Sequence, residues 1–288
     1  MKQKFFIPII LIILQICSII TIDISIEEWR DYPACRLGRL QSPIEINETY
    51  SNYSNDFSFV YQHYIPFHKI LNENLAYAEV YQINEGDDGG YINFERKGVI
   101  KQYKLIRLEI HRGLHVIDKK IADYELHLIH EKNLDFKTNR NQYRRITDPN
   151  MFLTVVLRYR KAANCKENNK NICGSDNGLL KAILEGQKEE AIDLNDNKYR
   201  IFQDKRAYFY EGSSLHIPCD ENVNYYIVKD FFYTDKDIDI NYNEGDIKTM
   251  DIYDRPVYKN FMNYSDVLRG NYIYLKFYLL FALIITLF

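Results

Sequence analysis

Arg107–Glu131 of this 288-residue chain reads RLEIHRGLHVIDKKIADYELHLIHE. Polar and apolar side chains alternate in its first part, where Arg107, Glu109 and His111 share one face. The same alternation returns over Glu125–His130. A period of two is the pattern of a β-strand, because successive side chains of a strand point to opposite sides. The segment therefore predicts two strands joined by a loop, and the rest of the fold is interpreted outward from them.

Candidate metal ligands lie on one face of this pair of strands. If the strands are neighbours in one sheet, Glu109, His111 and His127 converge there. Two ligands two residues apart, with a third from the next strand, is the arrangement that a metal site on a sheet requires. The same alternation is also typical of a solvated strand face. The spacing alone leaves both interpretations open.

Further motifs lie before and after the pair of strands. In chain order with the pair, the motifs are Trp29, Tyr32–Cys35, Gln41–Ile44, His111–Gly113, His115–Asp118, Glu125–His130, Gly212–Ser213, Pro218–Cys219 and Arg255–Pro256. Through these motifs, the chain resembles the alpha-type carbonic anhydrases over about residues 27 to 261. The form is divergent and similar to the catalytically inactive carbonic-anhydrase-related proteins. The resemblance implies a large central, twisted, mostly antiparallel sheet with small peripheral helices and a site in a conical cleft.

Short apolar runs with polar breaks agree with a mainly β fold. Besides the central pair, strands are predicted over 57–61, 76–81, 91–96, 151–159 and 222–228. Residues 179–190 combine helical spacing with good helix formers, which predicts a surface helix. The net charge of −3 favours neither a nucleic-acid partner nor strong attraction to anionic lipid.

The resemblance also implies a set of metal ligands, with one replacement. His111 and His127 match the second and third of three histidines that hold Zn²⁺ in the family, but Glu109 stands in place of the first. A carboxylate can ligate zinc, yet it cancels one unit of the metal's charge and leaves a bound water harder to ionise. Arg107 replaces a glutamine, and its guanidinium can pair with Glu109. Two arrangements stay open: an ion pair without bound metal, and a zinc site of weakened affinity.

Other catalytic positions of the family carry leucine. Leu114 and Leu215 stand in the places of the glutamate and threonine that orient the attacking hydroxide. Leu75 stands in the place of the histidine that shuttles protons. A leucine side chain can neither accept nor relay a proton. His216 follows Leu215; we expect it to be solvated, with a role as proton carrier or ligand as the alternative.

Three polar positions of the family's interior are kept. Glu125 matches the acid that supports a ligand histidine from behind. His115 and His130 match buried structural histidines. Because buried polar groups are paired in proteins, we expect all three to be hydrogen-bond partners within the fold rather than ligands.

The losses at one ligand, the orienting pair and the shuttle predict a domain that does not hydrate CO₂. We expect a binding or surface module, with an unknown protein or surface ligand as partner. The 25 tyrosines can supply contact area. One alternative is a divergent zinc-dependent carbonic anhydrase or esterase that uses Glu109, His111 and His127. Another is a purely structural coat protein.

Apolar segments stand near both ends of the chain. A basic start and an apolar run over 5–20 predict a secretory signal peptide over 1–22, with a signal anchor as the alternative. The carbonic-anhydrase-like domain is expected over 23–262. The polar spacer and hydrophobic tail over 263–288 predict a GPI signal or a tilted tail helix. Either one places the domain on the extracellular face of the plasma membrane.

The cysteines agree with a secreted chain. Four lie outside the predicted signal, and four cysteines allow three pairings. The resemblance implies a bridge between Cys35 and Cys219, which leaves Cys165 and Cys173 to close a small loop. Disulfides persist in oxidising compartments. Three sequons predict surface glycosylation, at Asn47, Asn52 and Asn263.

Overall fold

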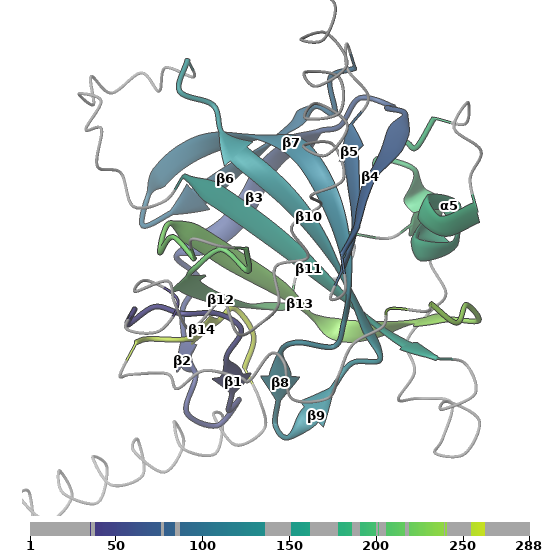
Figure 1. The fold of residues 1–288 in the computed structure, drawn as a ribbon. Coiled ribbons are helices and arrows are strands. Elements are labelled where there is room, and N and C mark those ends of the chain that lie inside the picture. The colour runs from purple at the N-terminus through teal and green to yellow at the C-terminus, as the bar shows by residue number, and fades with distance from the viewer. Residues whose placement is uncertain are drawn as a thin grey trace, which may run out of the picture.

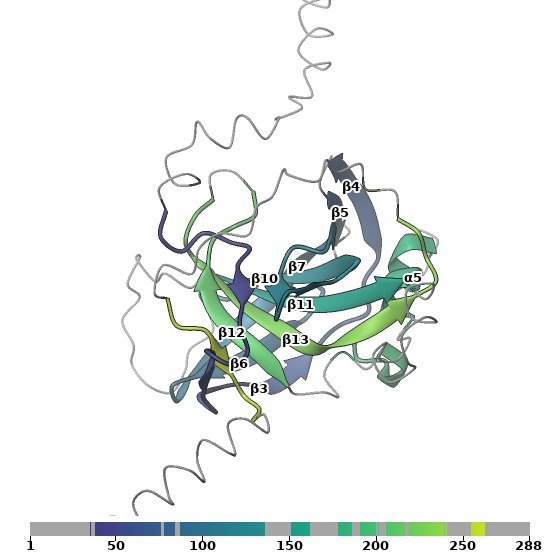
Figure 2. The ribbon, with the colours of Figure 1, turned by 90° about the horizontal axis from the view of Figure 1, so that it is seen from below.

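The computed structural model of the protein describes residues 35, 38–75, 78–83, 87–135, 151–161, 178–185, 191–199, 201, 206–216, 219–238, 240 and 255–262. These residues form one large sheet and one small sheet. Figure 1 shows the large sheet as a twisted fan of strands, and the view turned by 90° in Figure 2 shows that it curls. The mainly β architecture predicted from the sequence is therefore confirmed.

The large sheet has nine strands along its main path. In sheet order they are β2 (Asn52–Tyr53), β14 (Tyr258–Lys259), β12 (Ala207–Gly212), β13 (Val223–Thr234), β11 (Phe152–Lys161), β10 (Tyr124–Lys132), β7 (Val99–Arg112), β5 (Ala78–Ile83) and β4 (Lys69–Leu75). Off this path, β6 (Tyr91–Arg96) pairs with β7 and with β3 (Phe57–His63). The small sheet contains β1 (Glu45–Ile46), β8 (Val116–Ile117) and β9 (Lys120–Ile121).

The pairing in the large sheet is mostly antiparallel, as expected. Only β11 with β13 and β14 with β2 run parallel within the described sheet. The predicted central pair corresponds to the neighbouring strands β7 and β10, which pair along their length. At 14 residues, β7 is long enough to pair with β6 near its start and with β5 near its end. This central position brings the polar face of the pair into the middle of the sheet.

The two-residue strands β2 and β14 were not predicted from the sequence, and neither were two longer strands of the large sheet. One is β4, and the other is β12. From the sequence, only Gly212 at the end of β12 belongs to a motif, and that motif is a loop. The sequence of β12 is AYFYEG, and its first four residues are all buried. A strand that is buried on both faces loses the alternation by which strands are recognised. The predicted helix is present as α5 (Leu179–Glu185), while residues 186–190 lie outside the described chain.

Apolar side chains form a core on each face of the sheet. The larger cluster includes Leu108, Ile110, Leu126 and Leu128, and α5 packs its buried leucines and isoleucine onto it. The smaller cluster contains alternate residues of β12 and β13, such as Tyr208, Tyr210 and Tyr225. Beside this smaller cluster, β7 and β10 present Glu109, His111, Glu125 and His127, and each is at most 1% exposed. The centre of this face is thus polar and buried at the same time.

A disulfide joins Cys35 to Cys219, with Cα atoms 5.1 Å apart. This confirms the bridge that the family resemblance implied, and it fastens the loop after β12 to the start of the domain. Asn47 and Asn52 are exposed, as a glycosylation site requires. Four other predictions fall on residues outside the described ranges. They are the signal peptide over 1–22, the tail over 263–288, the loop closed by Cys165 and Cys173, and glycosylation at Asn263. Over the described ranges, no helix has the length and apolar character needed to cross a membrane.

His130 is a structural histidine, as predicted. Its Nδ1 lies 3.1 Å from the Leu153 carbonyl oxygen, and its Nε2 lies 2.9 Å from the Tyr64 hydroxyl. A carbonyl only accepts, so Nδ1 carries the proton and Nε2 accepts from the tyrosine. Burial lowers the pKa of His130 from 6.5 to about 4, although the contacts with backbone carbonyls act in the opposite direction. The imidazole is therefore neutral in the folded protein.

His130 should make the fold acid-sensitive above pH 4. As the pH falls below about 6.5, the unfolded chain binds a proton at this histidine that the folded chain does not bind until about pH 4. The free energy of unfolding should fall by ~3 kcal/mol across this window. In His130→Gln, which does not titrate, that part of the decline should vanish from urea unfolding curves recorded between pH 7 and pH 4. Equal declines in both proteins would contradict the neutral assignment.

Candidate metal centre

The site is assembled by the register of β7 and β10. In this antiparallel pair Glu109 lies opposite His127, and His111 lies opposite Glu125. Residues directly opposite each other have Cβ atoms only about 5 Å apart. The two strands therefore bring two carboxylates and two imidazoles onto one small area of the sheet, as the sequence predicted for Glu109, His111 and His127.

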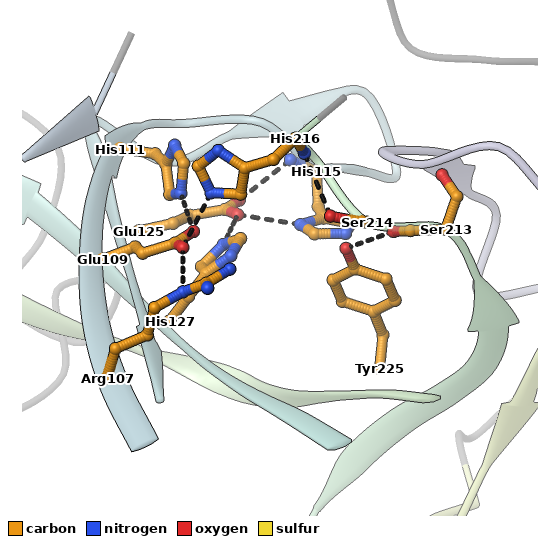
Figure 3. Close-up of polar contacts among 10 residues, drawn as sticks. All are labelled: Arg107, Glu109, His111, His115, Glu125, His127, Ser213, Ser214, His216 and Tyr225. Carbon is orange, nitrogen blue, oxygen red and sulfur yellow. Dashed lines mark hydrogen bonds and ion pairs between the residues drawn. The ribbon is translucent and has the colours of Figure 1, made fainter. Parts of the chain in front are cut away.

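The Glu109 carboxylate accepts hydrogen bonds from three side chains (Figure 3). Its Oε2 lies 3.0 Å from His111 Nε2, and its Oε1 lies 2.7 Å from Arg107 Nε. The same Oε1 lies 2.7 Å from His216 Nε2. A buried carboxylate is stable only when ion pairs and hydrogen bonds offset its desolvation. The three donors thus hold Glu109 in place, and the ion pair with Arg107 that the sequence suggested is present.

These contacts decide the protonation state of Glu109. Burial acts to raise the pKa of its carboxyl, but the charges and hydrogen bonds of His216 and His111 outweigh burial and hold the pKa well below its ordinary value. The carboxylate is ionised near neutral pH, so the imidazole N–H groups donate to it. Burial lowers the pKa of His111, although its contact with Glu109 acts in the opposite direction.

The second carboxylate, Glu125, organises the neighbouring histidines. It accepts hydrogen bonds from the backbone N–H of His115 at 2.8 Å, from His115 Nδ1 at 2.7 Å and from His127 Nε2 at 3.0 Å. His115 Nε2 lies 2.8 Å from the Tyr210 hydroxyl, which in turn bonds to Ser42 Oγ. Glu125 therefore fixes the ring of His127 from behind, and both Glu125 and His115 are hydrogen-bond partners of the fold, as expected.

One nitrogen of this cluster has no partner. No group in the described part of the chain hydrogen-bonds to His127 Nδ1, although this atom is buried. Candidate ligand atoms of Glu109, His111 and His127 lie within 4.8 Å of one another. Because Glu125 occupies Nε2, the free Nδ1 is the atom of His127 that remains for a metal. Two imidazoles and a carboxylate are a common set of zinc ligands, so these residues fit a divalent metal ion.

The sequence-based expectation of a solvated His216 is wrong, because the side chain is mostly buried. Its side chain is 22% exposed, and its Nε2 contacts the buried Glu109. The loop after β12 carries it over β7, and its backbone N–H bonds to Ser214 Oγ at 3.1 Å. Nothing in the sequence near His216 places it beside Glu109, which is 107 residues away. The contact arises from the way the sheet curls and the disulfide holds the loop.

The resemblance assigns leucines to positions that are catalytic in the family. Leu114 is 4% exposed and Leu215 is 3% exposed. Leu75 ends β4, and its side chain lies outside the described part of the chain. Tyr210, which supports His115, was not singled out from the sequence, because one tyrosine among 25 carries no local signal.

Comparison with known proteins agrees with this architecture. The sequence profile of the eukaryotic-type carbonic anhydrases matches residues 25–241. Two relatives from Arabidopsis thaliana are alpha carbonic anhydrase 8, 26% identical over 204 residues, and alpha carbonic anhydrase 6, 24% identical over 207 residues. The matches cover 70% and 72% of this chain, and 46% and 67% of those proteins.

A curled, mostly antiparallel sheet has buried histidines and two buried glutamates at its centre, and these residues could hold a metal ion. The profile match covers most of the chain, and the chain belongs to the eukaryotic-type, or alpha, carbonic anhydrase family. It spans about half the length of the first relative. The low identity agrees with the replacements at the site.

Glu125→Gln should destabilise the protein by about 3–5 kcal/mol, as loss of one partner from a buried ion pair does. The amide cannot accept all three hydrogen bonds and directs its own N–H groups at donors. Glu131→Gln is the matched control, since Glu131 is exposed on the same strand and should change stability by less than about 0.5 kcal/mol. Urea unfolding measures both variants. Equal stability of the two would refute the role given to Glu125.

Proposed function

We propose that this chain is an extracellular, membrane-tethered carbonic-anhydrase-like domain that does not hydrate CO₂ and acts as a binding or surface module. The observation that carries the proposal is the state of Glu109. It stands where the family resemblance implies a ligand imidazole, and it is an anion held by Arg107, His111 and His216. Those contacts favour a charge-neutralised cluster over an open catalytic site.

The residues around the cluster support the same conclusion. Hydration of CO₂ requires groups that orient the attacking oxygen and pass its proton on. The positions that the resemblance assigns to the orienting groups hold Leu114 and Leu215, and both side chains are buried. Hydrocarbon offers neither a donor nor an acceptor. A carboxylate ligand would also reduce the charge with which a metal ionises water.

The extracellular location is supported by the disulfide and by the chain termini. The Cys35–Cys219 bridge belongs to the chemistry of oxidising compartments. The apolar run over 5–20 and the hydrophobic tail in 263–288 have the form of a signal peptide and a membrane anchor. The exposure of Asn47 and Asn52 suits glycosylation in the secretory pathway.

Exposed aromatic side chains support a role in binding. Tyr50 is 80% exposed, Tyr61 is 51% exposed and Tyr53 is 48% exposed. Tyrosine gives large contact area at low entropic cost, and is enriched where proteins bind one another. These residues are contact positions that we propose for a protein or surface ligand.

A second candidate function is a divergent zinc-dependent hydratase or esterase that uses Glu109, His111 and His127. The unpartnered, buried Nδ1 of His127 favours it, because a metal ion would satisfy that atom. When bound there, zinc supplies a Lewis acid and an activated water. The chain's own residues would hold the ion, and Glu125 would orient His127.

Stopped-flow CO₂ hydration by the purified, zinc-supplemented full chain separates the two functions. We expect the rate of buffer alone, and no sulfonamide-sensitive hydrolysis of an activated ester. An active family member serves as the positive control. The triple variant Glu109→His, Leu114→Glu and Leu215→Thr restores the residues that the resemblance implies, and should gain a zinc-dependent hydration rate. Rapid hydration by the unaltered chain, abolished by chelation, would overturn the proposal.

A further inference from the structure

We infer that His216 is a fourth ligand of the candidate metal centre, so that three imidazoles and the Glu109 carboxylate enclose a divalent transition-metal ion. The three imidazoles are those of His111, His127 and His216. A closed set of four protein ligands is typical of structural zinc sites, whereas catalytic sites keep one position open. The inference deepens the proposed function and rests on it, because four ligands leave no position for a reacting water.

His216 lies close enough to Glu109 and His111 to join them as a ligand. Its Nε2 and that of His111 approach opposite oxygens of one carboxylate, at 2.7 Å and 3.0 Å. Figure 3 shows the two rings side by side above Glu109, with His127 on the other side of the carboxylate. The imidazole lost from the family's first ligand position thus has a counterpart that comes from a different part of the chain.

The unpartnered nitrogen of His127 is the second and independent observation. This side chain is 1% exposed, and its ring lies 4.6 Å from the ring of His111, measured between centroids. A buried polar atom without a partner costs about 1–3 kcal/mol. Within the described residues Nδ1 has no hydrogen bond, while Nε2 is held by Glu125. Because candidate ligand atoms of His127, Glu109 and His111 lie within 4.8 Å of one another, this buried nitrogen is available to a cation.

The loop that carries His216 is fastened on both sides of that residue. Ser214 N bonds to the Asp220 carbonyl at 2.9 Å, and Cys219 N bonds to the His216 carbonyl at 2.8 Å. The disulfide from Cys219 then ties the loop to Cys35. A ligand on a fastened loop loses little freedom when it binds. Arg107 is a positioning residue in this arrangement, since it holds Glu109 by one oxygen.

The donor atoms define the class of ion. Imidazole nitrogens suit zinc, copper, nickel and cobalt, whereas magnesium and calcium prefer sets of oxygen ligands. Three nitrogens and one carboxylate should therefore bind Zn²⁺ or Co²⁺ and leave Mg²⁺ and Ca²⁺ in solution.

The test measures metal binding rather than catalysis. Titration calorimetry with Zn²⁺ on the purified full chain should give one ion per chain. His216→Ala should weaken the affinity by at least ~100-fold, because even partners that only support a ligand cost 10–100-fold when they are removed. His63→Ala is the control, since His63 is exposed on β3 outside the cluster, and it should bind zinc like the unaltered chain.

X-ray absorption of the zinc-loaded protein counts the imidazoles directly. We expect three in the unaltered chain and two in His216→Asp, which keeps a ligating side chain at that position and so also serves if His216→Ala does not fold. Failure of the full chain to bind Zn²⁺, or two imidazoles in the unaltered chain, would overturn the inference. Hydration by a chain with three imidazoles would instead overturn the proposed function.

Discussion

The buried, ionised carboxylate of Glu109 constrains the side chains at the centre of this protein. Glu109 lies in the middle of the sheet and remains ionised because Arg107, His111 and His216 donate to it. A buried carboxylate without such partners would cost several kcal/mol. The loop after β12 is therefore joined to the centre of the sheet by electrostatics as well as by the disulfide. The three donors cannot be replaced independently of the charge that they neutralise.

A second buried carboxylate, that of Glu125, is also held by hydrogen bonds from neighbouring side chains. Glu125 binds two histidines, and one of them reaches Tyr210 and, beyond it, Ser42 near the start of the domain. The rings of His111 and His127 lie against each other where the two systems meet. The polar centre thus extends from β7 to Ser42, which lies just before β1. Such a network keeps its geometry only if each member keeps its partner.

The family fold is retained, while the resemblance assigns leucine to positions that are catalytic in the family. The hydrogen bonds of Glu125, His115 and Tyr210 hold the interior of the sheet together, so their loss would be felt as loss of stability. The positions assigned to catalysis do not take part in these stabilising hydrogen bonds. Leucine at 114 and 215 is well accommodated, because a buried hydrocarbon side chain gains free energy from leaving water.

Much of this was predictable from the chain alone. The period of two over Arg107–Glu131 predicted two strands and put Glu109 and His111 on one face of the first, because side chains of a strand alternate strictly. Their convergence with His127 was conditional on the two strands being neighbours, and the pairing of β7 with β10 fulfils that condition. The burial of β12 on both faces hid that strand from the same pattern. Only the tertiary structure brought His216 to Glu109 and left His127 Nδ1 without a partner in the described chain. Contacts between residues more than a hundred positions apart depend on how the sheet curls and where the disulfide closes, and local periodicity carries no information about either.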